Sequence, residues 1–347
     1  MTDVQSETGA PPGAGDQTVA DAGTGTGPAP ALVGDEERHI AERAARIASR
    51  SKPTRIVAAR VSIWLRLGEL WRARELFFFL VRKEIKVKYK NSALGFLWSM
   101  LNPALTLAVF YVLFTFFLPN GIPNFVIYMF SAMLVWNLFQ TAVLTGTSTI
   151  VSNAAIVKKV AFPREILALS TVGAQVFYFS LSAVAMAIIL VVLHATPDWG
   201  IVWLLIPAMA ALLVLASGIC VLLSALNVKL RDMRHLIEVL TQLWFWLTPI
   251  VYPYEKLAPH LHWLKWFYLS NPMTPIVLTF QRVLYPHLVV TSTNPPLKPP
   301  TYLPVLPVWS TNTYAELDGI ILAASVVLLV FAVWVFGRLE GNFAEEL

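Results

Sequence analysis

The chain has 347 residues, of which 56% are hydrophobic and 14% are charged. This balance excludes an ordinary soluble globular domain and is typical of a multi-pass membrane protein. The formal net charge is +5, but 15 of the 26 Lys and Arg residues precede residue 91 and most of the others gather in short loops, so the charges predict membrane sidedness and no nucleic-acid partner.

The N-terminal residues 1–60 are predicted to be a disordered or weakly ordered cytoplasmic tail. Residues 1–34 are rich in Gly, Ala, Pro and Thr and have few bulky apolar side chains, so they cannot offset the entropy cost of ordering. The first apolar stretch begins after residue 60, which is too late for a cleavable signal peptide. Insertion into the membrane is therefore expected to use the spans themselves.

Residues 68–90 are predicted to form an amphipathic helix that lies in the membrane interface. Trp71, Phe78 and Ile85 recur at seven-residue spacing. The cations of the same segment are candidates for binding lipid phosphates: Arg72, Arg74, Arg82, Lys83, Lys86 and Lys88. The alternative is a positive flank that only fixes the orientation of the first span.

The 67 residues between Lys90 and Lys158 contain no Asp, Glu, Lys or Arg. A helix needs about 20 apolar residues to cross a bilayer, so residues 94–118 and 125–147 each suffice. The segment Pro119–Asn124 is expected to form the turn between them. This hairpin would leave and return on one side of the membrane, and cations mark that side at both ends.

Three further predicted spans follow a basic loop at residues 152–165. The third covers the charge-free run 166–197 and the fourth covers 201–228, with a second basic loop at 227–235. The fifth has only 16 uncharged residues and contains Pro249, so its helix is expected to end early. The positive-inside rule then places both termini and both basic loops in the cytoplasm.

The first half of residues 256–314 is apolar but interrupted, which predicts short re-entrant helices or, alternatively, two half-spans. A sixth span is predicted at 319–336. The predicted fold is therefore an all-α polytopic membrane protein with six transmembrane helices in a permease domain of residues 91–347. The expected location is the cytoplasmic membrane.

The sequence lacks the usual catalytic and ion-coupling groups. No Gly-Lys pair occurs, so there is no phosphate-binding loop, and spans one to four contain no Asp, Glu, Lys or Arg. His260 and His262 are too few for a metal site, and Cys220, the single cysteine, is interpreted as a packing residue. We therefore expect no cofactor or metal in this chain, no catalytic residues, and a conduit that is powered by another protein.

The loop at 152–165 has two interpretations. It contains a short run that is compatible with a helix, closed by Phe162-Pro163-Arg164-Glu165, and a partner protein could press on such a compact loop. The simpler interpretation is an ordinary positive-inside loop. The residues that would contact a partner are Ile156, Val157, Lys158, Lys159, Phe162, Pro163 and Arg164.

Four stretches, in this order, resemble the membrane subunit of type 2 ABC exporters for polysaccharides, the O-antigen (Wzm-like) and teichoic-acid permease family. They are KVKYKNSALGFLWSMLNPALTLAVFYVLF at 86–114, KKVAFPREILALS at 158–170, NVKLRDMRHLIEVLTQLWFWLTPIVYP at 227–253 and LSNPMTPIV at 269–277. Each stretch alone is a weak signal, but the combination is specific. The N-terminal 60 residues depart from the family pattern.

The resemblance implies a homodimer of six-span subunits with two copies of a separate ATPase, which would bind ATP and Mg. It implies that residues 152–164 contain the ATPase-coupling helix and that residues 70–89 lie along the interface. The conduit is expected between the subunits, along spans one and five, where aromatic rings can stack on sugars. These rings are Trp98, Tyr111, Phe114, Trp244, Phe245, Trp246 and Tyr252. The basic cations are then candidates for the pyrophosphate of a lipid-linked glycan.

The leading hypothesis is a permease that exports a lipid-linked cell-envelope polysaccharide, such as a galactan or an O-antigen-like glycan. One alternative within the transporter class is an ABC permease for a drug or a lipid. Another is an integral-membrane glycosyl or acyl transferase, for which the candidate groups on the outer side are scattered along the sequence: Asp198, Glu255, Glu316 and Asp318.

Overall fold

The structure is a computed structural model that describes residues 63–90, 97–117, 122, 124–254, 267–285, 289–292 and 301–347. The chain divides into two units, Met1–Ile56 and Val57–Leu347. All the described residues belong to the second unit. The predicted tail of residues 1–60 therefore lies outside them.

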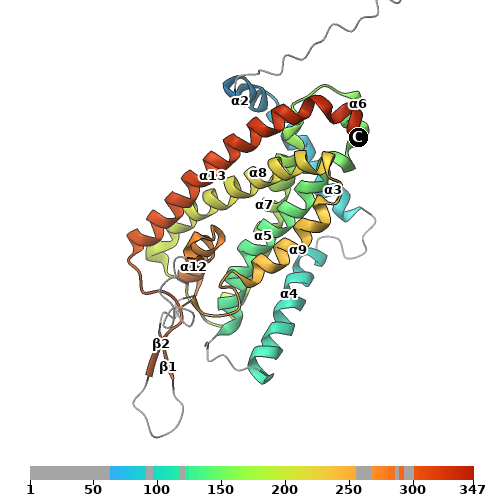
Figure 1. The fold of residues 1–347 in the computed structure, drawn as a ribbon. Helices are drawn as coiled ribbons and strands as arrows, with labels where there is room; N and C mark the ends of the chain where they lie inside the picture. Colours follow the sequence, from blue (N-terminus) through green and yellow to red (C-terminus); the bar gives the residue numbers. More distant parts are fainter. Residues whose placement is uncertain are drawn as a thin grey trace, which may run out of the picture. The chain divides into compact units, whose positions relative to one another are not determined.

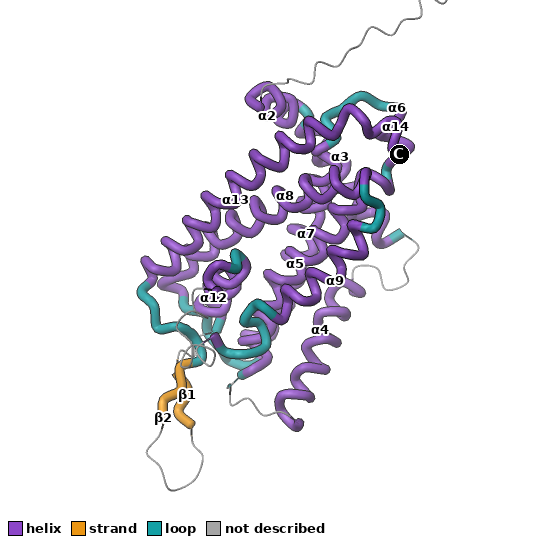
Figure 2. The backbone as a smooth tube through the Cα atoms, viewed as in Figure 1, coloured by secondary structure: helices purple, strands orange, loops and turns teal. Residues whose placement is uncertain are grey.

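The described chain is a bundle of helices with one small hairpin (Figures 1 and 2). The first half contains α2 (Ile63–Arg72), α3 (Arg74–Tyr89), α4 (Leu97–Val112) with its π-helical extension η1 (Leu113–Phe117), α5 (Phe125–Ser152), α6 (Ala154–Lys159) and α7 (Glu165–Val192). The second half contains the 3-10 helix η2 (Trp199–Leu204), α8 (Leu205–Lys229), α9 (Met233–Trp246), α12 (Met273–Leu284), α13 (Thr311–Leu339), η3 (Glu340–Asn342) and α14 (Phe343–Glu346).

Four helical segments are long and apolar enough to cross a membrane: Phe125–Ser152, Glu165–Val192, Trp199–Lys229 and Thr311–Leu339. They correspond to the second, third, fourth and sixth predicted spans. The first and fifth predicted spans correspond to α4 with η1 and to the 14-residue helix α9. An α-helix of that length extends for about 21 Å, against about 30 Å of bilayer core, so the number of six crossings stays a prediction.

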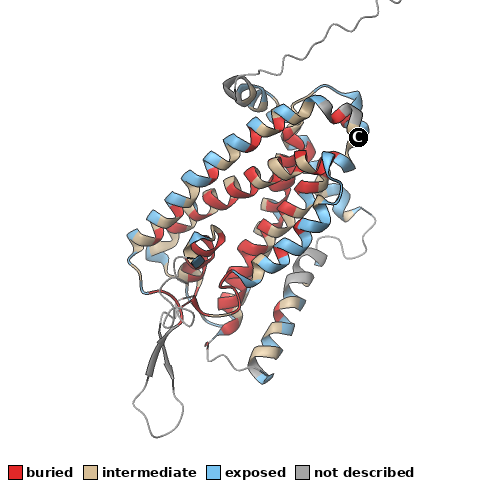
Figure 3. Cartoon of the chain, in the orientation of Figure 1, coloured by how far each residue is buried: buried red, intermediate tan, exposed pale blue. Residues whose placement is uncertain are grey.

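The core of the bundle lies around α5, which packs against α7, α8, α9 and α12, while α13 packs along α8 (Figure 3). Gly218 permits the close approach of α8 and α13. A Cβ atom at this position would lie 3.1 Å from the backbone nitrogen of Leu329 and 3.3 Å from its Cα. Small residues at such crossings are typical of helix packing in membranes.

The prediction of an all-α fold is confirmed for the bundle and requires one correction. Strands β1 (Val289–Ser292) and β2 (Thr301–Pro304) pair antiparallel, with Val289 opposite Pro304. They carry Val, Thr and Tyr, which favour strands, and they lie in a region where the sequence predicted no regular structure.

Three predicted helix boundaries can be compared with the structure. The helix predicted at 68–90 is divided at Ala73 into α2 and α3. As expected, α9 ends at Trp246, before Pro249. By contrast, α13 begins at Thr311, earlier than the predicted start at 319, because the Ser310 hydroxyl accepts a hydrogen bond from the Thr313 amide at 3.2 Å and caps the helix.

Candidate functional site

The predicted coupling loop forms the short helix α6, which directly follows α5. Val157 is 2% exposed and attaches α6 to the bundle. Ile156, Lys158, Lys159 and Val160 are exposed. The exposed side chains of α6 and of Val160, directly after it, therefore combine apolar and cationic groups, a composition suited to binding another protein.

The end of this loop is held by a cluster of ion pairs from three distant parts of the chain. The Arg66 guanidinium, on α2, forms ion pairs with Glu165, at the start of α7, and with Glu340, at 3.0 Å, in η3. The Glu165 side chain is 3% exposed and that of Arg66 is 16% exposed. We refer to Arg66, Arg164, Glu165 and Glu340 as the ionic junction.

Arg164 links the same junction to the C-terminal segment. Its Nη1 donates to the backbone carbonyl of Glu340 at 3.0 Å, and its Nε lies 3.7 Å from the Glu340 carboxylate. The guanidinium also lies 5.9 Å from the ring centre of Phe343, a buried residue of α14. The C-terminal segment is therefore attached directly to the residues that follow α6.

The electrostatics of the junction favour a permanent cation at Arg66. Burial by itself lowers the pKa of Arg66, but the carboxylates of Glu165 and Glu340 more than compensate, so that the pKa lies above its ordinary value. Gly337 leaves space for this side chain, because a Cβ there would lie 2.8 Å from Arg66 Cζ. Of the four junction residues, only Arg164 was a predicted contact for a partner protein; Glu165 was predicted only as the end of the loop, and Arg66 and Glu340 were not predicted to take part.

A second contact brings the other basic loop to the same end of the molecule. Arg231, which follows α8, donates to the backbone carbonyl of Glu346 at 3.4 Å. Together with the ionic junction, this contact places α2, both basic loops and the C-terminal segment at one end, near the label C in Figure 1. A common side for the two basic loops and the chain termini is also what the positive-inside rule predicts.

The basic helix α3 packs against α7 and reaches the coupling loop. Its packing depends on Gly173, where a Cβ would lie 2.8 Å from both Phe77 Cζ and Val81 Cγ2. Lys83 donates to Asn153 Oδ1 at 2.7 Å, directly before α6. This bond joins the predicted interfacial helix to the predicted coupling helix.

The other lipid-phosphate candidates lie on the surface of α2 and α3. Arg72, Arg74, Arg82 and Lys86 are exposed, as are Trp71 and Phe78 of the predicted apolar stripe. The Lys88 ammonium lies 3.8 Å from the ring centre of Tyr178, and desolvation lowers the pKa of Lys88. The exposed rings and cations are compatible with a helix at a membrane surface.

The seven aromatic candidates for the conduit do not form a single exposed surface. Tyr111 and Trp246 are exposed, at 44% and 51%. Four others are half-buried against the core: Phe114, Trp244, Phe245 and Tyr252. The side chain of Trp98 lies outside the described residues.

Two of these rings support the end of α9 rather than an open surface. The indole nitrogen of Trp244 donates to Asn271 Oδ1 at 2.8 Å, and the Tyr252 hydroxyl donates to the Trp246 carbonyl at 2.6 Å. Asn271 Nδ2 also donates to Thr248 Oγ1 at 3.0 Å. We refer to Trp244, Thr248, Tyr252 and Asn271 as the neutral junction.

The acidic residues that the transferase alternative requires contact different partners. Asp198 pairs with Arg282 at 3.1 Å. Asp318 lies inside α13, fully buried, and accepts from the Thr279 hydroxyl at 2.8 Å, whereas the sixth span was predicted to begin directly after it, at residue 319. Among the described residues, no hydrogen bond or ion pair joins two of these acids, and Glu255 is not one of the described residues.

Within the described ranges, no three His, Cys, Asp or Glu side chains form a group that could hold a metal ion. Cys220 is buried, and its thiol donates to the Ala142 carbonyl at 3.2 Å, which agrees with the predicted packing role. Gly146 of α5 leaves space for this side chain, because a Cβ there would lie 2.7 Å from Cys220 Sγ.

Comparison with known proteins matches residues 75–285 to the family described as ABC-2 type transporter. The chain belongs to this family. It is also similar to an O-antigen export system permease protein of Myxococcus xanthus, with 34% identity over 220 residues, 63% of this chain and 84% of the relative. A Klebsiella pneumoniae protein with the same description is 26% identical over 273 residues, 79% of this chain and 95% of the relative.

The resemblance to type 2 ABC exporters is thereby confirmed. A second Klebsiella pneumoniae O-antigen export system permease is 26% identical over 209 residues, 60% of this chain and 80% of the relative. The family match and the long apolar helices identify a multi-pass membrane protein and a transport subunit.

Proposed function

We propose that this chain is the permease subunit of an ATP-driven ABC transporter that exports a lipid-linked cell-envelope polysaccharide. The observation that carries the proposal is the similarity to O-antigen export permeases, which extends over 84% of the Myxococcus relative and 95% of a Klebsiella relative. The polysaccharide class is taken from these relatives, and an O-antigen-like glycan or a galactan is the proposed cargo.

The energy is proposed to come from two copies of a partner ATPase, which bind ATP and Mg, acting on a homodimer of this chain. The outer face of α6, with Ile156, Lys158, Lys159 and Val160, supports this role because it is exposed while Val157 anchors the helix. A force on α6 would reach α7 through Glu165, α2 through Arg66 and α3 through the bond between Lys83 and Asn153. These contacts provide a physical path from the partner to the bundle.

The cargo is proposed to enter at the basic helices and to pass between the two subunits. The exposed cations of α2 and α3 can form charge-assisted hydrogen bonds with a pyrophosphate. Of the aromatic candidates, Tyr111 and Trp246 are the best placed to stack on sugars, because their rings are exposed. Both termini and the end that carries α6 are proposed to be cytoplasmic, in the cytoplasmic membrane.

Co-expression with a candidate ATPase tests this proposal. The purified chain should lack ATPase activity alone, and it should co-purify with a nucleotide-binding subunit whose activity depends on the complex. Depletion of the chain should leave lipid-linked glycan on the cytoplasmic side. Normal surface glycan after depletion, with accumulation of a drug or a lipid instead, would favour the alternative exporters and contradict the proposed cargo.

A further inference from the structure

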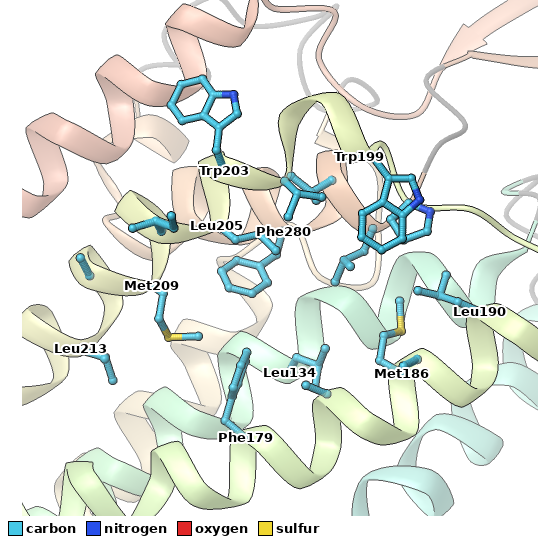
Figure 4. Close-up of a pocket in the computed structure, with 18 residues that line it drawn as sticks. Leu134, Phe179, Met186, Leu190, Trp199, Trp203, Leu205, Met209, Leu213 and Phe280 are labelled. Carbon is cyan, nitrogen blue, oxygen red and sulfur yellow. The ribbon is translucent and has the colours of Figure 1, made fainter.

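An apolar groove of about 790 Å³ lies between α5, α7, η2, α8 and α12 (Figure 4). Phe179, Met186, Trp203, Met209 and Phe280 are among the residues that line it. No lining side chain is charged, and none carries a hydroxyl or an amide group. The groove is separate from α6 and from the ionic junction.

The length of the groove corresponds to one leaflet of a membrane. On α7 its lining extends from Phe179 to Leu190, and on η2 and α8 it extends from Trp199 to Leu213. At a helical rise of about 1.5 Å per residue, the stretch on α7 spans roughly 16 Å. The hydrocarbon core of a bilayer is about 30 Å thick, so the groove extends through approximately half of it.

One end of the groove is polar. Asp198 and Arg282 form an ion pair at 3.1 Å, and the Asp198 amide donates to the Val283 carbonyl at 3.0 Å. Pro197, Trp199 and Val283, the chain neighbours of this pair, belong to the lining. The pair therefore lies where the groove meets the turn between α7 and η2.

Exposed tryptophans mark the same end. Trp199 is 74% exposed and Trp203 is 49% exposed. Tryptophan is enriched where the hydrocarbon meets the headgroups, because the indole ring is apolar and its N–H is polar. From its polar end, the groove presents first the ion pair, then the tryptophans and then aliphatic side chains. A phospholipid has its charged headgroup, its interfacial region and its hydrocarbon chains in the same order.

We propose that the groove binds one acyl chain of a membrane phospholipid whose zwitterionic headgroup lies against Arg282 and Asp198. The apolar lining would cover the chain, the Arg282 guanidinium would bind the phosphate, and the Asp198 carboxylate would bind the headgroup ammonium. Nη1 of Arg282 makes the contact with Asp198. Because a guanidinium carries five N–H donors in a fixed fork, its other N–H groups can donate to the phosphate. This lipid is a resident component of the bundle and is distinct from the proposed cargo.

Photo-crosslinking of the full-length chain in lipid nanodiscs tests the site. The probe is phosphatidylethanolamine with a photoreactive group in the middle of one acyl chain. We expect labelling of peptides from residues 179–190 and 202–213. Ala210→Trp fills the groove and should reduce this labelling about tenfold, because the indole occupies the space of the acyl chain.

Val191→Trp is the matched control, because Val191 is 74% exposed, lies on α7 and is not part of the lining. It should leave the labelling unchanged. Ala187→Trp fills the groove from α7 and replaces the first variant if Ala210→Trp does not yield a monodisperse protein. Equal labelling of the control and the groove variants would overturn the proposal, because it would indicate ordinary boundary lipid.

The headgroup assignment has its own test. A phosphatidylglycerol probe with the same photoreactive chain lacks the ammonium group and should label the groove less strongly than phosphatidylethanolamine. Equal or stronger labelling by phosphatidylglycerol would overturn the proposed zwitterionic headgroup. A loss of dimers in Ala210→Trp without a change in lipid labelling would instead identify a second copy of the chain as the occupant. None of these measurements depends on transport, so they are independent of the proposed export function.

Discussion

The ionic junction and the neutral junction fasten different parts of the same bundle by different chemistry. Arg66, Glu165 and Glu340 come together as charged groups from positions 99 and 274 residues apart. Trp244, Thr248 and Asn271 lie within 27 positions of one another and are joined by neutral hydrogen bonds. The first junction therefore connects distant elements, whereas the second stabilises the end of α9 locally.

The difference between the two junctions indicates how the elements around each of them can move. Charges are expensive to bury without partners, so loss of one ionic contact affects all the elements that share the junction. A neutral hydrogen bond contributes less and can exchange with another donor or acceptor. We therefore expect the ionic junction to move as a unit with α6, and the neutral junction to allow local adjustment near α9.

The largest effect is expected at the ionic junction. Glu165→Ala should lower the free energy of unfolding by about 3 kcal/mol, because it removes one partner of a buried ion pair and leaves Arg66 with Glu340 alone. Thermal unfolding in detergent measures the change. Glu316→Ala, an exposed glutamate of α13, is the matched control and should have little effect. Equal melting temperatures for the two variants would show that the junction does not stabilise the bundle.

A somewhat smaller effect is expected where α3 packs on α7. Gly173→Leu should cost roughly 1–3 kcal/mol, because its side chain would collide with Phe77 and Val81. Gly319→Leu is the control, since a Cβ at Gly319 meets no atom within 4 Å. Protease accessibility of residues 74–89 reports the detachment of α3. If Gly173→Leu remained as protected as the control, the close packing of α3 on α7 would be wrong.

The buried bond between α12 and α13 gives the third prediction. Thr279→Val should lower stability by about 2 kcal/mol, because the Asp318 carboxylate would lose its hydroxyl donor in a buried position. Thr279→Ser keeps the hydroxyl and should restore most of this loss. Both are compared by thermal unfolding in the same detergent. A serine variant as unstable as the valine variant would assign the effect to packing rather than to the hydrogen bond.

The smallest effect is expected at the neutral junction. Trp244→Phe removes the donor to Asn271 and should cost about 1 kcal/mol. Trp246→Phe, at an exposed ring on the same helix, should cost less. A greater loss of stability for Trp246→Phe than for Trp244→Phe would contradict the assignment of the supporting role to Trp244.

Local sequence signals were sufficient for much of the fold. The charge-free runs located the four long apolar helices, and Pro249 marked the early end of α9, because proline disrupts helical hydrogen bonding. The basic loop at 152–165 contained α6 with residues Ile156, Lys158 and Lys159 on its outer face. In each case the decisive information lay within a few residues of the element.

Contacts between distant segments could not be predicted in this way. Nothing in the sequence around Arg66 indicates Glu165 or Glu340 as its partners. The predicted sixth span begins directly after Asp318, but α13 includes this residue, and Thr279, 39 positions away, supplies it with a buried hydrogen bond. The aromatic candidates also show that composition alone does not separate exposed rings, such as Trp246, from packed rings, such as Trp244.

The central claim is that α6 is the contact with the ATPase, and site-specific photo-crosslinking tests it most directly. A photoreactive phenylalanine analogue at Ile156 or Lys158, on the exposed face, should crosslink to the co-purifying nucleotide-binding subunit under ultraviolet light. The same analogue at Val191, on α7, should not. Crosslinking at Val191 but not at Ile156 or Lys158 would contradict the account.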